Sequence, residues 1–371
     1  MNYCTRCVLP DTRPALVLDA EGVCNACRVA ERRASIDWDE RHAQFRAVLE
    51  HAKAHSIGYD CIIPVSGGKD STWQVLTCLE HGLTPLAVTW KTPARTAIGE
   101  QNLQNLIRLG VDHIDYSINP ETERVFMLEA LRRLGSPAIP MHLGIFSIPL
   151  TLAARYRIPL VVWGENSAFE YGTRDETLTG FRMDAAWLRQ YGVSGGTTAA
   201  DWVSDRLSRR ALAAYFAPSD QDLQAAGVSA IFLGYYFDWD VRTTYEKALA
   251  HGFRAGDGPR TGYYEYADID DDFISIHHHL KWYKFGFTRA FDNLSLEIRR
   301  GRMTREQAIA IIRARGDDTP HDDIAQFCRF VGLSEHEFFS IAEQFRNRAI
   351  WSRVGGRWCM KEFLIPDWKW T

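Results

Sequence analysis

Residues 64–71 read PVSGGKDS and follow directly after the apolar run CII. Two glycines let a backbone turn tightly and approach a ligand, while serine hydroxyls and a lysine ammonium supply hydrogen-bond donors. A strand that passes through such a turn into a helix aims free N–H groups and the positive helix end at one point, which suits a phosphate. Asp70 can hold the Mg²⁺ that accompanies a nucleotide. The stretch therefore predicts a nucleotide-phosphate site, and a serine-glycine turn capped by Asp70 is the alternative.

The pattern is neither GxxxxGK[ST] nor GxGxxG, so it indicates neither an ordinary nucleotide hydrolase nor a dinucleotide enzyme. SGGKDS after a strand resembles the signature of the PP-loop ATP pyrophosphatases. The resemblance implies that the loop binds the outgoing pyrophosphate of ATP while AMP is transferred to a carbonyl oxygen. It also implies that Thr89 and Trp90, at the end of the second strand, lie near the adenine. The predicted loop contacts are Ser66, Gly67, Gly68, Lys69, Asp70 and Ser71, with Lys69 and Asp70 catalytic.

A second group of reactive residues lies in CTRC and CNAC, which contribute Cys4, Cys7, Cys24 and Cys27. Two C-x2-C pairs form the two halves of a tetrahedral zinc site that has no open position. Such a closed site is structural, and metal binding supplies folding free energy to a segment with few apolar residues. A redox CxxC and an iron-sulfur cluster are alternatives, but two symmetric pairs among turn residues favour Zn²⁺.

Further candidates follow the apolar run that ends at Trp163. Gly164 and Glu165 are expected to face the same crevice as the loop, where Glu165 could bind Mg²⁺ or take a proton from an incoming nucleophile. A helix cap with a solvated acid is the alternative. The candidate substrate contacts in this stretch are Asn166, Glu170 and Tyr171.

Lys281 and Lys284 share a helix face, so they are candidate catalytic contacts to the ATP phosphates, with surface lysine as the alternative. Arg289, after Gly286, is a candidate contact to phosphate or substrate. The acidic run at 268–272 is typical of a solvated face. The three histidines at 277–279 lack the spacing of a metal site.

These residues need a scaffold, and short apolar runs alternate with helical patterns between about residues 60 and 240. Such alternation indicates a parallel sheet with helices on both faces, whose ligands bind beyond the carboxyl ends of the strands. The expected strands are 60–65, 83–90, 111–118, 158–163 and 230–235, and the expected helices are 37–55, 70–81, 97–110 and 120–135.

The predicted fold class is α/β, with three parts. A zinc ribbon spans 1–35, a PP-loop ATP-binding domain of the adenine nucleotide alpha hydrolase-like (HUP) type spans 36–274, and a helical region spans 275–371. The net charge of −4 gives no overall attraction to nucleic acid or anionic lipid. No apolar stretch reaches the roughly 18 residues of a membrane span, and the start lacks the apolar core of a secretion signal, so we expect a cytoplasmic protein.

Several stretches are similar to the N-acetyl sugar amidotransferases: YCTRCVLPDTRP with EGVCNAC, PVSGGKDST, VVWGENSAFEYG, FLGYYFDWD and HHHLKWYKFGFTRAFDNLSLEIRRGRMTREQA. They occur in order over most of the chain, and only residues 190–215 do not contribute. The resemblance implies an enzyme of bacterial surface-polysaccharide synthesis, such as lipopolysaccharide O-antigen. It implies that ATP and Mg²⁺ activate the acetamido group of a nucleotide sugar, which ammonia converts to an acetamidino group with release of AMP and pyrophosphate.

The resemblance also implies two partners that supply ammonia, a glutaminase subunit and a cyclase-like barrel subunit resembling those of imidazole glycerol phosphate synthase. The chain has Asn2 where an amino-terminal cysteine nucleophile would stand, and it shows no glutaminase motif. Two other functions remain open. A PP-loop tRNA thiolation enzyme is disfavoured by the net charge and by the lack of a CxxC after the loop. A noncatalytic scaffold of a sugar-modifying complex is disfavoured by the intact loop.

Overall fold

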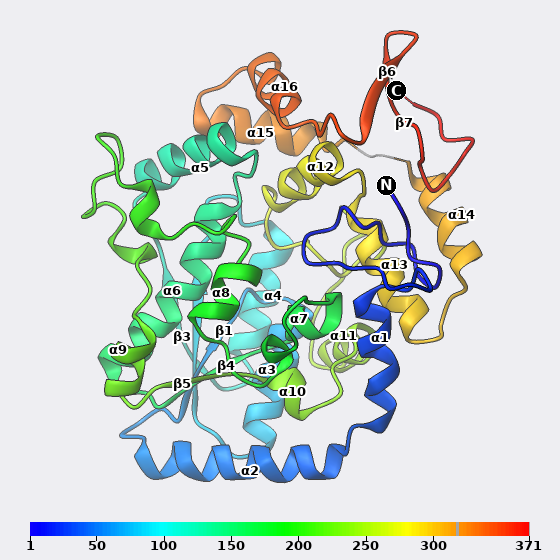
Figure 1. Ribbon diagram of the computed structural model, residues 1–371. Coiled ribbons are helices and arrows are strands. Elements are labelled where there is room, and N and C mark those ends of the chain that lie inside the picture. The colour runs from blue at the N-terminus through cyan, green and yellow to red at the C-terminus, as the bar shows by residue number, and fades with distance from the viewer. Residues whose placement is uncertain (317–318, 371) are drawn as a thin grey trace.

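A computed structural model describes residues 1–316 and 319–370 (Figure 1). Its centre is a five-stranded parallel sheet with the strand order β3-β2-β1-β4-β5. The order reverses direction between β1 and β4, which pair directly through Ile62 and Val161. In open sheets of this kind, the ligand crevice lies at that reversal, beyond the carboxyl ends of the strands. The strands are β1 (Cys61–Pro64), β2 (Pro85–Trp90), β3 (Asp112–Tyr116), β4 (Leu160–Trp163) and β5 (Ser229–Phe232).

Helices cover both faces of the sheet. Neighbouring residues of β1 point to opposite sides, so Ile62 packs in one apolar cluster with α5 and α6, while Ile63 packs in another with α2, α3 and α4. The helices of this part are α2 (Trp38–His55), α3 (Lys69–Glu80), α4 (Ala97–Ile107), α5 (Pro120–Leu134), α6 (Ile139–Tyr156), α7 (Ser167–Tyr171), α8 (Ala185–Tyr191), α9 (Asp220–Ala225), α10 (Leu233–Tyr236) and α11 (Val241–Leu249).

The C-terminal region is mainly helical and ends in an antiparallel hairpin that the sequence did not predict. Two of its helices begin with a motif that is readable in the sequence, because Thr304 with Gln307 and Ser334 with Glu337 each form a capping box. The elements are α12 (Ile274–Phe285), α13 (Arg289–Arg299), α14 (Arg305–Arg315), α15 (His321–Val331), α16 (Glu335–Gln344), β6 (Trp351–Val354) and β7 (Arg357–Met360).

The N-terminal segment, with α1 (Asn25–Arg32), packs against this C-terminal region rather than standing apart. Figure 1 shows the blue segment beside α13 and α14. One apolar cluster joins Val8 and Leu9 to Phe291, Trp351 and other C-terminal side chains. The two ends of the chain therefore share a core.

The α/β class and all five predicted strands are confirmed, with shorter strand ends. Helix α6 was not predicted, because Pro149 lies inside it and removes one backbone donor. Its burial against β1, β2 and β4 outweighs that loss. Within the described chain, none of the helices has both the length and the apolar composition that crossing a bilayer requires. The proposed domain boundaries stay predictions.

Candidate functional site

The turn between β1 and α3 needs its first glycine. Gly67 has a φ of +89°, and a Cβ there would lie 2.5 Å from the backbone N of Leu103. Gly68 is the N-cap of α3 and provides no side-chain cap, so the first amides of this helix have no side-chain acceptor at that position. The Ser71 hydroxyl donates to the Gly68 carbonyl at 3.0 Å and braces the turn. The turn therefore presents uncapped N–H groups, as an anion site requires.

Lys69 and Asp70 start α3 as a charged pair. Lys69 is only 5% exposed, and its ammonium binds the Asp70 carboxylate. Trp239 Nε1 at 3.0 Å and Thr244 Oγ1 at 3.1 Å donate to Asp70 Oδ1. The loop is thus anchored to α11 and to the residues just before it.

A cavity of about 370 Å³ opens beyond the carboxyl ends of β1, β2 and β4. Such a volume is in the range of small-molecule sites. Ser66, Gly68, Asp70 and Ser71 line one side. Side chains of α6, spaced one helical turn apart, form an apolar wall opposite the polar loop: Met141, Ile145 and Pro149. Their i, i+4 spacing was the only sequence signal for this wall.

Glu165 lines the same cavity at the end of β4. Burial, together with the nearby Asp70 carboxylate, raises the pKa of Glu165 to about 7. A carboxyl with such a pKa exchanges protons near neutral pH, as a general base must. Gly164 lies beside it, where a Cβ would come within 3.3 Å of Gln74 Oε1. The structure thus brings the residues after β1 and β4 together.

The acidic run at 268–272 is not the solvated face that its composition suggested. Asp268, Asp270 and Asp271 all line the cavity, and Asp271 is only 6% exposed. Burial raises the pKa of Asp271 to about 7 and also raises the pKa of Asp270. The sequence interpretation failed because it could not show that the chain returns to this edge of the sheet. There the Asp270 carbonyl accepts a bond from the backbone N of Thr96, which precedes α4, at 3.2 Å.

Thr89 and Trp90 line the cavity at the end of β2, where the adenine was expected. Thr89 Oγ1 lies 2.9 Å from His113 Nε2. Trp90 Nε1 donates to Glu123 at 2.8 Å, and burial raises the pKa of Glu123 to about 8. Both side chains are therefore held in place, while their contact with a base stays a prediction.

Three predicted substrate contacts do not line this cavity. Asn166 uses its amide group to bind the carbonyls of Leu178 and Gly180, and its side-chain oxygen accepts from Trp187 Nε1 at 2.9 Å. The guanidinium carbon of Arg13 lies over the ring of Tyr171, 4.9 Å from the ring centre. These partners are structural, so a role in substrate binding gains no support from them.

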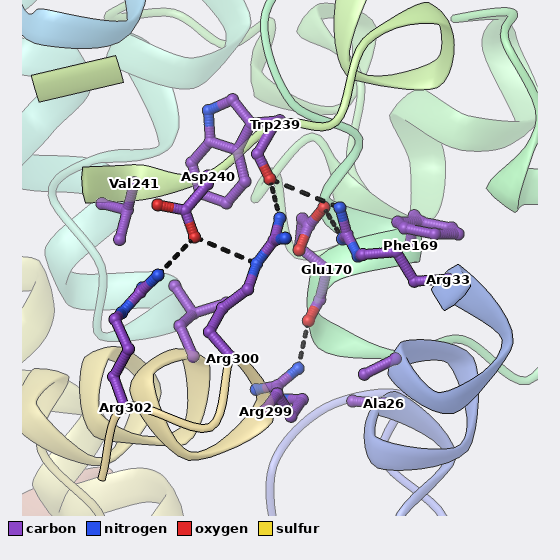
Figure 2. Close-up of a pocket in the computed structure, with 12 residues that line it drawn as sticks. Ala26, Arg33, Phe169, Glu170, Trp239, Asp240, Val241, Arg299, Arg300 and Arg302 are labelled. Atoms are coloured by element: carbon purple, nitrogen blue, oxygen red, sulfur yellow. Dashed lines mark hydrogen bonds and ion pairs between the residues drawn. The ribbon is translucent and has the colours of Figure 1, made fainter. Parts of the chain in front are cut away.

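Glu170, the third, lies in a smaller pocket that arginines surround (Figure 2). It pairs with Arg33 at 2.5 Å, and its carbonyl accepts from Arg299. On the same wall, Asp240 binds Arg300 and Arg302. The space left is about 30 Å³, enough for water rather than a substrate. This pocket is a set of buried ion pairs that joins α1, α7 and α13.

The predicted cations of the C-terminal region also lie outside the first cavity. Lys281 binds Asp292, and Lys284 donates to the Gly135 carbonyl at 3.0 Å. Burial lowers the pKa of each lysine to about 8. Arg289 contacts Asp268 at 3.3 Å and lines a separate cavity behind it. Contact between these cations and ATP phosphates stays a prediction.

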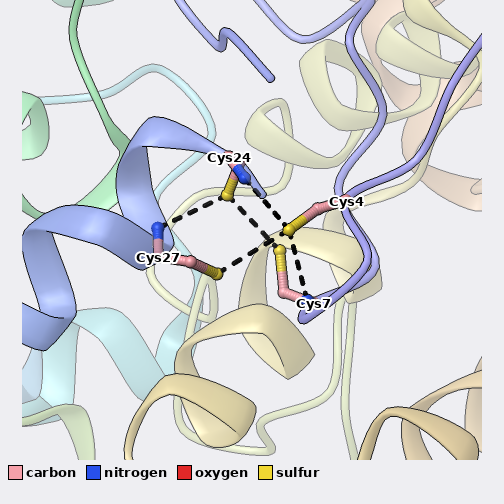
Figure 3. A group of neighbouring side chains, drawn as sticks. All are labelled: Cys4, Cys7, Cys24 and Cys27. Atoms are coloured by element: carbon pink, nitrogen blue, oxygen red, sulfur yellow. Dashed lines mark hydrogen bonds between the residues drawn. The ribbon is translucent and has the colours of Figure 1, made fainter. Parts of the chain in front are cut away.

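The four N-terminal cysteines meet at one point, with their sulfur atoms all within 4.8 Å of one another (Figure 3). The distances are 3.9 Å between Cys4 and Cys27 and 3.7 Å between Cys7 and Cys24. A tetrahedron of sulfurs bound to Zn²⁺ at about 2.3 Å has edges of about 3.8 Å. The Cys24 amide donates to Cys4 Sγ at 3.2 Å, as zinc-binding turns do. The group fits a closed zinc site, and within the described residues it is the only cluster with metal-site geometry.

Two arginines attach this site to the C-terminal region. Burial works against the charge of Arg299, but Cys7, Cys27 and Cys24 keep its pKa above the usual value, and its Nη2 is buried without a hydrogen-bond partner. A buried cation beside four sulfurs fits the −2 charge of a zinc-tetrathiolate. Arg305 donates to the Cys7 carbonyl at 3.0 Å. Arg305 thus holds the backbone of the Cys4–Cys7 turn, and the charge of Arg299 favours the ionised sulfurs.

Comparison with known proteins gives one sequence match and one loose overlap. Residues 259–364 match a family described as "LPS biosynthesis protein WbpG-like, C-terminal domain". No curated protein matches the chain. The NMN synthetase of Francisella tularensis overlaps 58% of this chain and 93% of its own, at 14% identity and a TM-score of 0.28. Such an overlap says nothing about chemistry.

The match covers the acidic run, α12 and α13, which carry Asp268 at the first cavity and Arg289 at the second. The α/β fold follows from the strand order and from the loop after β1. We conclude that residues 259–364 are similar to the C-terminal domain of WbpG-like lipopolysaccharide biosynthesis proteins.

Proposed function

We propose that the chain is an ATP-dependent, AMP-forming amidotransferase. It adenylates the acetamido group of a bacterial surface-polysaccharide nucleotide sugar and replaces the acetamido oxygen with ammonia. The carrying observation is that the uncapped α3 amides and the Glu165 carboxyl face one cavity at neighbouring strand ends. The similarity of residues 259–364 to a lipopolysaccharide-biosynthesis domain supports the substrate class.

In the first step, the acetamido oxygen attacks the α-phosphorus of ATP, and the bond to the β-phosphate breaks. The loop amides and Lys69 stabilise the charge that develops on the leaving pyrophosphate. The acids around the loop do not form a complete metal site in the described chain. Asp70 would hold Mg²⁺ together with phosphate oxygens, which such an ion commonly uses as ligands.

In the second step, ammonia adds to the imidate carbon, AMP leaves, and an acetamidino group remains. The attacking nitrogen must lose a proton, and we assign the role of base to Glu165, which lines the cavity at the end of β4 and has a pKa of about 7. The apolar wall of α6 limits the access of water, which would otherwise hydrolyse the adenylate.

Ammonia comes from partners in this proposal. Within the described chain, no cysteine lines the cavity, and neighbouring Cys78 together with burial raises the pKa of Cys61 well above its usual value. We propose a glutaminase subunit and a cyclase-like barrel subunit as the source. The purified chain alone should use ammonium salts and not glutamine. The same lack of a thiol at the cavity disfavours tRNA thiolation.

The test is mass spectrometry of candidate nucleotide sugars after incubation with ATP, Mg²⁺ and ammonium. A product lighter by the difference between oxygen and NH, with equal amounts of AMP and pyrophosphate, is expected. Release of ADP and orthophosphate, or efficient glutamine use by the single chain, would contradict the proposal.

A further inference from the structure

The proposed reaction needs the Lys69 ammonium at the leaving pyrophosphate, yet Lys69 does not line the cavity at the loop. Its neighbours Gly68 and Asp70 both line that cavity. Lys69 is buried, and its ammonium binds Oδ2 of Asp70. Because a buried ammonium needs an anion beside it, Lys69 can leave Asp70 only when another anion replaces that carboxylate. Contact between Lys69 and a phosphate therefore requires a change of partner.

Two aromatic rings lie beside the Lys69 ammonium. Its Nζ is 5.9 Å from the centre of the Trp239 ring and 6.0 Å from the centre of the Tyr266 ring. Both distances are at the outer limit of cation–π attraction, so the rings cannot take the place of an anion. Tyr266 is itself fixed, because its ring stacks on that of Tyr245 with centroids 3.8 Å apart. The rings keep water from the ion pair, which strengthens the attraction between its charges.

Trp239 also fixes the carboxylate of the pair. Its Nε1 donates to Asp70 Oδ1 at 3.0 Å, and Thr244 Oγ1 donates to the same oxygen at 3.1 Å. The backbone of Trp239 is held in turn, because its carbonyl accepts from Arg33 at 3.3 Å and from Arg300 (Figure 2). Oδ1 is therefore occupied by two buried donors, and Oδ2 carries the ammonium.

The Asp70 carboxylate can be reached from the cavity. Its side chain is 30% exposed, and Asp70 lines the cavity. Because Oδ1 already accepts two hydrogen bonds, Oδ2 is the oxygen that can bind a metal ion together with nucleotide phosphates. Oδ2 cannot hold a divalent cation and the ammonium at once, since the two positive charges repel each other. Lys69 then has to pair with the phosphate that the uncapped amides of α3 bind.

We propose that the Lys69–Asp70 ion pair is a switch that makes the Mg²⁺ complex of the nucleotide the form that binds. Without Mg²⁺, Asp70 keeps Lys69, and the phosphates lack their cationic partner. With Mg²⁺, Asp70 binds the metal and Lys69 pairs with the pyrophosphate part of ATP. Trp239 and Thr244 are positioning residues, because they orient Asp70. The inference rests on the proposed function for the identity of the ligand, which is ATP with Mg²⁺.

The experiment is calorimetric titration of the full chain with α,β-methylene ATP, once with Mg²⁺ and once with Mg²⁺ omitted. No chelator is added, so the cysteine site keeps its metal. The wild type should bind the analogue at least about tenfold more tightly with Mg²⁺, because a charged donor is gained. Asp70→Asn keeps an acceptor for Trp239 and Thr244 but cannot hold the ammonium. Without Mg²⁺, it should bind the analogue about three- to tenfold more tightly than the wild type, because Lys69 is free to pair with a phosphate.

Asp270→Asn is the matched control. Asp270 lines the same cavity and makes no ion pair with Lys69 in the described chain. Its substitution removes one carboxylate and leaves the switch intact, so the affinity without Mg²⁺ should rise by less than about twofold at physiological salt. An equal rise in Asp270→Asn and Asp70→Asn overturns the proposal, because the charge of the cavity would then explain both. Equal affinity of Asp70→Asn and the wild type without Mg²⁺ also overturns it.

The positioning role has its own test. Trp239→Phe keeps an aromatic ring and removes one donor to Asp70, so it should reduce the gain in affinity that Mg²⁺ gives by about three- to tenfold. Thr244→Val removes the other donor and keeps the shape, so it tests the role even if Trp239→Phe does not fold. It should reduce the same gain by about two- to fivefold. A gain that stays at the wild-type value in both variants excludes the positioning role.

The outcomes separate the switch from the proposed function. Equal binding of the analogue to the wild type with and without Mg²⁺ overturns the switch and leaves the reaction standing. Failure of the wild type to bind the analogue under either condition contradicts both. A switch that behaves as expected in a protein that releases no AMP with any acceptor contradicts only the proposed reaction.

Discussion

The cysteine cluster and the nucleotide cavity both start from a short motif, but one is closed and the other is open. Four buried sulfurs can fill all positions of a tetrahedral ion, and nothing further can enter. The loop after β1 instead leaves amides uncapped and borrows its remaining walls from α6, from the end of β4 and from the acidic run. A motif that supplies all the ligands of a metal ion can only stabilise the fold. A motif that leaves hydrogen-bond donors unpaired can bind a substrate and take part in a reaction.

Removal of the metal should have the largest effect. In Cys24→Ser, or after chelation, we expect a large fall in melting temperature, since binding of structural zinc supplies on the order of 10 kcal/mol in small domains. Cys359→Ser is the control, because Cys359 lies in the β6–β7 hairpin, outside the cluster. Metal analysis should find one zinc per chain in the control. An unchanged melting temperature in Cys24→Ser would contradict the assignment of the cysteine cluster as a structural metal site.

Loss of the base should act on rate and not on stability. Glu165→Gln should lower turnover by about 10² to 10⁴, with Glu50→Gln, on the exposed side of α2, as the control. Because the raised pKa of Glu165 is about 7, its basic form is populated above that pH. Wild-type turnover at constant free ammonia should therefore rise from pH 6 to 8, and the mutant should lose this rise. A mutant that keeps the full rise would exclude Glu165 as the base.

Removal of the lysine charge in the loop should lower the rate somewhat less than removal of the base. Lys69→Ala should lower the rate of pyrophosphate release by about 10². Lys53→Ala, which removes an exposed lysine of α2, should change it little. Initial rates at saturating ATP measure the difference. Less than a tenfold loss, about 1.4 kcal/mol of barrier, would mean that the open site lies elsewhere.

The smallest effect should come from the contact between the two regions. Arg299 lies beside the cysteines and also binds the Glu170 carbonyl, five residues after Glu165. Arg299→Met should lower zinc affinity about 10- to 100-fold, because it removes a buried positive charge beside the sulfurs, while nucleotide binding changes less. Competition with a chromophoric chelator gives the first quantity and calorimetry the second. Equal losses in both would show that the two sites are one cooperative unit.

Local patterns were sufficient for much of the scaffold. Apolar runs bounded by turn residues predicted all five strands, and capping residues marked the starts of α14 and α16. Alternation could not predict α6, whose internal Pro149 opposes a helix and whose stability comes from burial against three strands. It also could not predict that the ribbon shares a core with the β6–β7 hairpin.

The candidate site divides in the same way. The loop and the four cysteines are contiguous or paired in sequence, so residue type and spacing alone indicated their chemistry. The roles of Asp268, Asp270 and Asp271 depend on a return of the chain to the loop over some 200 residues, counted from Asp70. No local pattern encodes that return, because a buried acid and a solvated acid are identical in sequence.

The amino-acid sequence by itself determined which groups can bind an anion or a metal, since that follows from side-chain chemistry and short spacing. Only the tertiary structure decided which of them face a common space. Packing placed Glu170 in a buried ion pair with Arg33. It placed Arg289 at a second cavity, behind Asp268. The physical reason is that charge and hydrogen-bonding capacity are local properties, whereas burial and proximity depend on contacts between distant segments.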